Sequence, residues 1–243
     1  MSRARRLALQ LAGIAVTLAI WEVVGRIMGE ALLAAPSVVL RDYGGLLREG
    51  VMLQELAGSL RQMLLGFGLA CAAGMPLGIL MGASGKINAT FNLSMTILSY
   101  LPVPAIVPLT MAWWGSGEKQ KIGFLALVTF CGLLPQVVRA ISSVEHRYVL
   151  SAYSQGATAW QIVSRVMIPI AIPDIFSAIR MCLGIGWTYI LLVEVIKAGE
   201  GVGGVGNLIV VYHRLGHMSE VYLTVVAIMI VGALMDRTCR RYQ

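Results

Sequence analysis

Long runs of apolar residues recur along almost the whole of this 243-residue chain. They cover about residues 7–28, 59–81, 122–140, 174–195 and 221–235, and a further run at 91–114 is interrupted by prolines. An α-helix needs roughly 20 mostly apolar residues to cross a bilayer, and helices satisfy their own backbone hydrogen bonds in lipid. Only 13% of the residues are charged, against roughly 25% in soluble domains. The sequence therefore predicts an all-α, polytopic membrane protein with about six transmembrane helices.

The basic residues flank the apolar runs instead of forming one solvated face. Three arginines precede the first run and three follow the last: Arg3, Arg5, Arg6, Arg237, Arg240 and Arg241. The net charge of +7 therefore points to the lipid bilayer as partner and not to nucleic acid. The positive-inside rule predicts that both termini are cytoplasmic, with the first run retained as a membrane span.

The run at 91–114 contains Pro102, Pro104 and Pro108, three prolines within seven residues. Proline removes a backbone donor and clashes with the preceding helical turn, so one regular helix is excluded here. Irregular backbone at membrane depth is tolerated where it is buried in protein or faces a water-filled cavity. Two interpretations remain open: this segment lines a translocation path, with Pro102 and Pro104 as candidates, or it lies near a membrane interface.

Small residues recur every four positions in the second run: Gly66, Ala70, Gly74, Gly78 and Gly82. Such a ladder allows a neighbouring helix to approach closely. We expect ordinary packing inside the same chain, with Gly74 and Gly78 against another helix.

Two ionisable residues fall within the run at 174–195. Charged groups in hydrocarbon usually face the interior of a helix bundle or a cavity. Arg180 either attracts an anionic substrate or is held by a structural partner such as Asp174, with snorkelling to the interface as a further option. Glu194 either belongs to an outer gate or pairs with Lys197.

The chain contains no motif of the phosphate-binding-loop type, so we do not expect it to hydrolyse ATP. No arrangement of nucleophile, base and acid is apparent, and we expect no catalytic residue and no cofactor. His213 and His217 have a spacing that can hold zinc on a helix, but no convincing ligand set completes it. We therefore expect no metal site and interpret the pair as part of a solvated helix face.

One long polar-rich segment, LSAYSQGATAWQIVSRVMIP at 150–169, lies between two apolar runs. Its pattern is that of an amphipathic helix, with Trp160, Val163 and Met167 close to one face. A helix of this kind lies along a membrane or fits a groove in a soluble partner.

This segment also resembles the cytoplasmic coupling loop of ATP-binding-cassette (ABC) importer permeases. The family motif reads Glu-Ala-Ala, three residues, Gly, nine residues, Ile-x-Leu-Pro. Ala152 and Gly156 fall in register, and Val166, Ile168 and Pro169 match the end. The chain departs from the motif at the first two positions, where Leu150 replaces Glu and Ser151 replaces Ala.

Four more segments resemble the nitrate, sulfonate, taurine and bicarbonate permeases of that family. They are Ser59 to Gly82, Leu98 to Ile122, the stretch IPIAIPDIFSAIRMCLGIGW, and GVGGVGNLI. The order of the five segments matches the family over about residues 32–210.

The resemblance implies the type I ABC importer (MetI-like) permease fold, as a single transmembrane domain over residues 1–243 with a core at about 55–240. Residues 141–172 would then form the cytoplasmic coupling loop. Its implied ATPase-coupling residues are Leu150, Ser151, Ala152, Gly156, Ala157, Trp160 and Pro169. The implied partners are cytoplasmic ATP-binding subunits, a second permease copy forming a homodimer, and an extracytoplasmic solute-binding protein. The implied location is the bacterial plasma (inner) membrane.

From this resemblance we expect a permease subunit that forms the path for a small solute, an anion such as a sulfonate, taurine, nitrate or bicarbonate. The alternative is a secondary transporter or channel that works without ATP. The absence of an inverted second half in the hydropathy pattern favours the importer.

Overall fold

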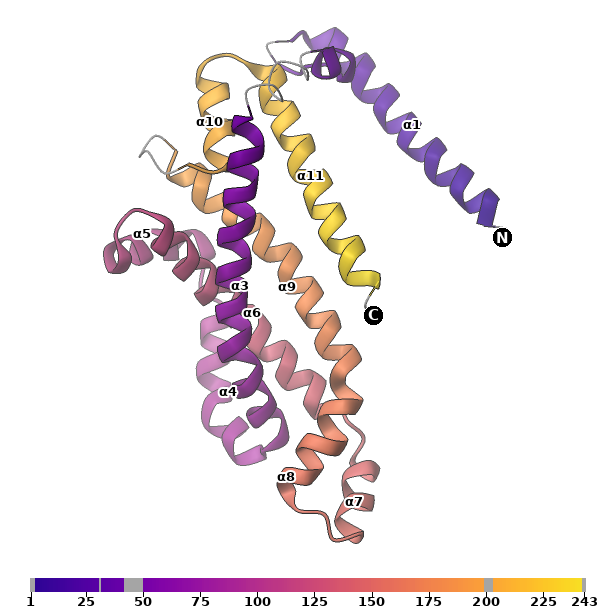
Figure 1. Ribbon diagram of the computed structural model, residues 1–243, viewed down its shortest axis with the longest axis vertical. Helices are drawn as coiled ribbons and strands as arrows, with labels where there is room; N and C mark the ends of the chain where they lie inside the picture. Colours follow the sequence, from indigo (N-terminus) through magenta and orange to yellow (C-terminus); the bar gives the residue numbers. More distant parts are fainter. Residues whose placement is uncertain (1–2, 31, 42–49, 199–202, 242–243) are drawn as a thin grey trace. The chain divides into compact units, whose positions relative to one another are not determined.

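The computed structural model describes residues 3–30, 32–41, 50–198 and 203–241, and every named element in them is helical (Figure 1). The elements are α1 (Arg3–Met28), α3 (Val51–Ala83), α4 (Gly85–Ser99), α5 (Val103–Trp114), α6 (Glu118–Ser142), α7 (His146–Ser154), α8 (Ala159–Ile162), the π-helix η1 (Val163–Met167), α9 (Ile168–Ile196), α10 (Val205–Arg214) and α11 (Met218–Arg241).

Five helical segments in the described residues are long and apolar enough to cross a membrane. They are Ala8–Met28, Val51–Ala83, Glu118–Ser142, Ala159–Ile196 and Met218–Arg240. The pair α4 and α5 adds a sixth span if its two bent halves count as one. The prediction of about six membrane helices is thus confirmed, although most of these helices extend several residues beyond the apolar runs.

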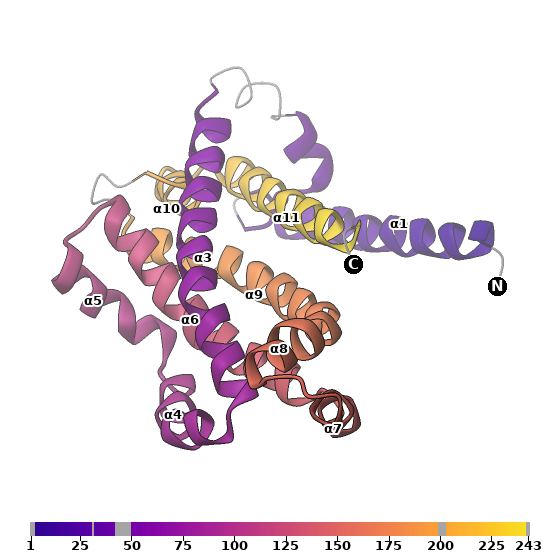
Figure 2. The same cartoon turned by 60° about the horizontal axis from the view of Figure 1, so that its bottom comes forward.

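The proline-rich run breaks into two helices where the sequence predicted a break. α4 ends at Ser99, Pro102 is the N-cap of α5, and the two helices are bent by 101° (Figures 1 and 2). Pro104 lies in the first turn of α5, where the missing N–H has no helical partner to lose. The prolines therefore set the position of the bend.

The described chain divides into two compact units. The first consists of Met1–Gly58 with Lys197–Val231, and the second of Ser59–Ile196 with Gly232–Gln243. In the first unit, Ala34, Val39, Met52 and Leu223 form a buried cluster. The Trp21 indole donates a hydrogen bond to the Ala34 carbonyl (3.1 Å), which attaches α1 to that cluster.

The second unit is built on close packing between α3 and α6. A Cβ on Gly78 would lie 2.8 Å from the Val137 Cβ, and a Cβ on Gly82 would lie 2.6 Å from the Ile141 Cβ. Real side chains do not approach so closely, so these positions accept only glycine without movement. Gly74 faces Phe130 of α6 at 3.4 Å by the same measure, which confirms the predicted ladder.

Candidate functional site

The segment between α6 and α9 is a tight helical hairpin in the second unit. α7 ends in a Schellman motif, in which Gly156 N–H donates to the Tyr153 carbonyl (2.9 Å) and Ala157 N–H donates to the Ala152 carbonyl (3.1 Å). Gly156 has φ +80°, the left-handed conformation that this motif requires. The Schellman motif thus explains why glycine stands at 156, four residues after Ala152 and directly before Ala157.

The next helix starts immediately after this turn. Thr158 is its N-cap and forms a capping box with Gln161, whose side chain accepts from the Thr158 N–H at 2.8 Å. The chain then passes through the π-helix η1, directly before Pro169 in the first turn of α9. Only Gly156 and Ala157 separate the Gln155 C-cap of α7 from the Thr158 N-cap of α8, so the hairpin has little freedom at its turn.

One face of the hairpin is packed against the ends of the long helices. Ile162 and Met167 are buried in a cluster with Ile141 of α6 and Ile175 of α9. Ala152 and Ala157 pack against the same cluster. The hairpin is therefore in direct packing contact with α6 and α9.

The hairpin also exposes four large apolar side chains. The exposed fractions are 42% for Tyr148, 53% for Leu150, 54% for Tyr153 and 70% for Trp160. The predicted grouping of Trp160 with Met167 is therefore wrong, because Met167 is buried and Trp160 is not. The π turn lies between buried Ile162 and Met167 and changes the helical phase that the periodicity assumed. Ser151 and Pro169 are also exposed. Figures 1 and 2 show α7 and α8 together at one end of α9.

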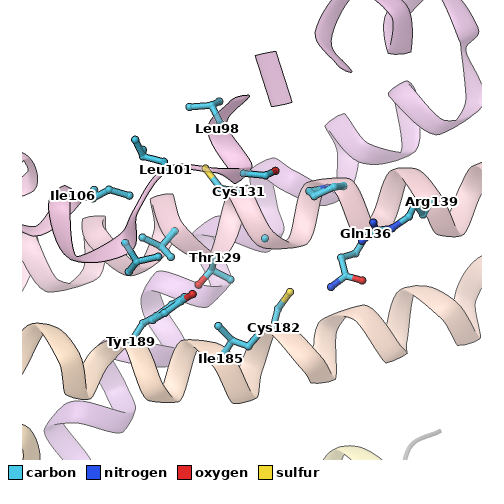
Figure 3. Close-up of a pocket in the computed structure, with 15 residues that line it drawn as sticks. Leu98, Leu101, Ile106, Thr129, Cys131, Gln136, Arg139, Cys182, Ile185 and Tyr189 are labelled. Atoms are coloured by element: carbon cyan, nitrogen blue, oxygen red, sulfur yellow. The ribbon is translucent and has the colours of Figure 1, made fainter. Parts of the chain in front are cut away.

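A cavity of about 330 Å³ lies beside the α4–α5 bend and between α6 and α9 (Figure 3). Its volume falls at the lower end of the range typical of ligand pockets. Leu98, Leu101, Val103 and Ile106 line it from the proline-rich run, on both sides of Pro102. Pro102 and Pro104 themselves are not among the described lining residues, and their place on a translocation path stays a prediction.

The polar lining of this cavity comes mainly from α6 and α9. α6 contributes Thr129, Cys131, Gln136 and Arg139, and α9 contributes Tyr189. Figure 3 shows Thr129 and Tyr189 near one another, with Gln136 and Arg139 further along α6. None of these residues was singled out from the sequence. Thr129, Gln136 and Arg139 have the i, i+7, i+10 spacing of one face of α6, which is the signal that identifies them in retrospect.

Arg180 is held in an ion pair within the second unit. Its Nε lies 2.6 Å from Asp236 Oδ1 on α11, and Arg240 Nε lies 2.9 Å from the other carboxylate oxygen. The structural-partner interpretation is supported, but the partner is Asp236 rather than the expected Asp174. Asp174 lies six residues before Arg180, whereas Asp236 is brought near only by the packing of α11 on α9.

Glu194 is fully buried and belongs to a polar cluster that joins three helices. Its Oε1 lies 3.4 Å from Lys121 Nζ of α6 and accepts a hydrogen bond from Ser59 Oγ of α3 at 2.7 Å. Gln120 continues this polar layer by donating to Thr110 Oγ1 of α5 at 2.8 Å. Lys121 is fully buried in the first turn of α6.

The two histidines do not lie on one helix face. α10 ends at Arg214, Gly216 follows with φ +77°, and His217 directly precedes α11. His217 Nδ1 lies 3.5 Å from Glu220 Oε1. No group of three metal-ligating side chains occurs in the described residues.

Comparisons with known proteins agree with this architecture. The family model for the binding-protein-dependent transport system inner membrane component matches residues 74–237. The taurine transport system permease protein TauC of Escherichia coli is 31% identical over 208 residues, which cover 82% of this chain and 75% of that relative. A putative ABC transporter permease of Methanocaldococcus jannaschii is 27% identical over 241 residues, covering 97% of this chain and 90% of the relative.

A solved structure of the MetNI methionine ABC transporter in an inward-facing conformation matches with a TM-score of 0.69 at 20% identity, covering 80% of this chain and 95% of that one. The predicted MetI-like permease fold is thereby confirmed, in a multi-pass membrane protein. The chain belongs to the family of binding-protein-dependent transport system inner membrane components, as the permease component of an ABC importer.

Proposed function

We propose that this permease imports a small anion, with ATP hydrolysed by a separate cytoplasmic subunit that docks on the α7–α8 hairpin. A second copy of the chain completes the path, and a solute-binding protein delivers the substrate from outside. Relatives named for taurine, aliphatic sulfonates and bicarbonate support the anion class.

The observation that carries this proposal is the two-sided construction of the hairpin. The hairpin exposes Tyr148, Leu150, Tyr153 and Trp160, at the end of the bundle predicted to be cytoplasmic. Clustered exposed apolar side chains mark interaction sites, and aromatic residues are enriched at the centres of protein interfaces. Its inner face packs on α6 and α9, which border the cavity. A partner that displaces the hairpin thus acts on two walls of that cavity.

In this proposal, the coupling residues are those of the hairpin from Leu150 to Trp160, with Pro169 at the start of α9. Pro102 and Pro104 shape the path, since residues on both sides of them line the cavity. Arg180 and Glu194 are each held in an ion pair and maintain the positions of the helices around the path. Alternating access would follow from rocking of these helices.

The test is Gly156→Asp, with Gly156→Asn as matched control. Asn and Asp adopt the left-handed conformation with similar ease and have nearly the same size, so the two variants differ mainly in charge. Nothing beyond the chain neighbours lies within 4 Å of a Cβ at this position, and Asn and Asp are among the side chains that best accept its φ of +80°, so the fold of the permease itself should tolerate both. We expect Gly156→Asp to insert normally but to lose ATPase association or substrate-stimulated ATP hydrolysis, while Gly156→Asn keeps much of both.

Full coupled hydrolysis by Gly156→Asp in the reconstituted complex would show that the hairpin is not the transmission element. Uptake by the lone chain in liposomes without ATP would instead support an ATP-independent transporter.

A further inference from the structure

We infer that Arg139 is the residue that makes the cavity beside the α4–α5 bend selective for anions, as a direct electrostatic contact for a small oxyanion passing through it. This inference rests on the proposed import of an anion and adds the group on the path that recognises it.

Arg139 is placed where a passing solute would meet it. It lines the 330 Å³ cavity and also a second cavity of about 310 Å³ bordered by Gln136, Ser143, Asp174 and Ser177. Its side chain is exposed and has no hydrogen bond or ion pair among the described residues. Arg180 differs in this respect, because Asp236 already neutralises it.

The remaining lining of the first cavity is compatible with an anion. Its described lining residues include no carboxylate, and its polar side chains include the hydroxyls of Thr129 and Tyr189 and the amide of Gln136. Each of these groups has an N–H or O–H that can donate to an oxyanion. The Asp174 carboxylate borders only the second cavity. The field in the first cavity is therefore dominated by the positive charge of Arg139.

An arginine suits this role better than a lysine. Its planar guanidinium presents a fork of N–H donors that matches two oxygens of one planar or tetrahedral oxyanion. Sulfonates, nitrate and bicarbonate all offer such a pair of oxygens. A single arginine without further cations attracts the anion but does not trap it, as a transport path requires.

Arg139 also lies two residues before the predicted cytoplasmic coupling loop at 141–172, where the positive-inside rule expects basic residues. Lys86, at the start of α4, offers the matched control for that role. It is exposed, also lies at the predicted cytoplasmic end, and lines neither cavity. Removal of Lys86 deletes an inside charge and leaves the cavity unchanged.

The first test measures the field inside the cavity without any transport. Cys131 lines the same cavity eight positions before Arg139 on α6, which is about 12 Å along the helix. In a full-length chain with Cys71, Cys182 and Cys239 replaced by alanine, Cys131 is labelled with a sulfonate-bearing and a trimethylammonium-bearing thiosulfonate. At an effective dielectric constant of about 40, removing one positive charge at this distance slows labelling by the anionic reagent about threefold and speeds labelling by the cationic reagent about threefold. Arg139→Gln should therefore lower the ratio of anionic to cationic labelling about tenfold.

Arg139→Lys should keep most of the original ratio, and Lys86→Gln should leave it unchanged. An unaltered ratio in Arg139→Gln overturns the inference, as does a Cys131 that neither reagent reaches.

The second test uses the complex reconstituted with its ATPase and binding protein, and follows ATP-dependent uptake of taurine, methanesulfonate, nitrate and bicarbonate. For an anion that the unaltered complex imports, Arg139→Gln should lower uptake at least tenfold, while Arg139→Lys and Lys86→Gln remain within about threefold of the original. Equal uptake by Arg139→Gln refutes the role of Arg139 and leaves the proposed function intact. If the unaltered complex imports none of the four solutes, each of which carries an anionic oxygen group, the anion proposal itself fails and this inference fails with it.

Discussion

Separating the buried charges of Lys121 and Glu194 should destabilise the permease far more than removing an exposed pair. The two groups are 3.4 Å apart and fully buried, so each loses its hydration in the folded protein. At an effective dielectric constant of about 20, their attraction is about 5 kcal/mol. Removal of one partner leaves the other charge buried without that compensation, which typically costs about 3–5 kcal/mol. That loss is a large part of the roughly 5–15 kcal/mol that stabilises a folded protein.

The double variant should recover most of that loss. In Lys121→Met with Glu194→Gln, both charges of this pair are removed together, and the amide oxygen introduced at position 194 can still accept the Ser59 hydrogen bond. We expect the double variant to lie within about 2 kcal/mol of the original chain, because a buried ion pair replaced by neutral groups of similar size is often nearly neutral. The coupling energy between the two positions should then exceed about 2 kcal/mol.

The assay is denaturant unfolding of the purified permease in detergent micelles, for the original chain, both single variants and the double variant. The exposed pair of Arg61 and Glu118, with side chains 65% and 43% exposed, provides the control. Arg61→Gln should cost no more than about 1 kcal/mol. If Lys121→Met costs no more than Arg61→Gln, or if the double variant costs the sum of the singles, the Lys121–Glu194 pair does not hold the helices together.

Two further outcomes follow from the packing and from the hairpin surface. Gly78→Ala should lower the stability of the folded permease by about 1–3 kcal/mol, because its Cβ would lie 2.8 Å from Val137. In the control, Gly68→Ala, the Cβ has nothing within 4 Å, so its stability should be unchanged or higher. Equal unfolding midpoints for both variants would show that the α3–α6 contact can adjust at no cost. Leu150→Glu should insert and fold normally, since Leu150 is 53% exposed. It should nevertheless weaken assembly with the ATPase about tenfold or more in a pull-down titration, because a charge is desolvated at an apolar contact. Leu150→Gln should have a smaller effect, and equal affinity for the two variants would argue against such a contact.

The sequence by itself determined the features that depend on local composition and period. The apolar runs required membrane helices, because only a chain with internally satisfied backbone groups can cross lipid. Pro102 determined where the run at 91–114 breaks, since proline cannot continue a regular helix, and the structure bends there by 101°. Gly78 indicated a close helix contact, and in the structure a Cβ at that position would lie 2.8 Å from the Val137 Cβ.

The tertiary structure alone decided which polar groups meet. Lys121 and Glu194 are 73 residues apart, and Arg180 and Asp236 are 56 apart, so neither pairing has a local signature. The orientation of Trp160 depends on a π turn that shifts the helical phase, which a regular 3.6-residue period cannot anticipate. In the sequence, Arg139 is a basic residue near the end of an apolar run. Only the packing of α6 beside α9 and the α4–α5 bend shows that it lines a cavity. For the two ion pairs and for Arg139, the deciding contacts join residues that the chain separates widely, and they form only once the helices have packed.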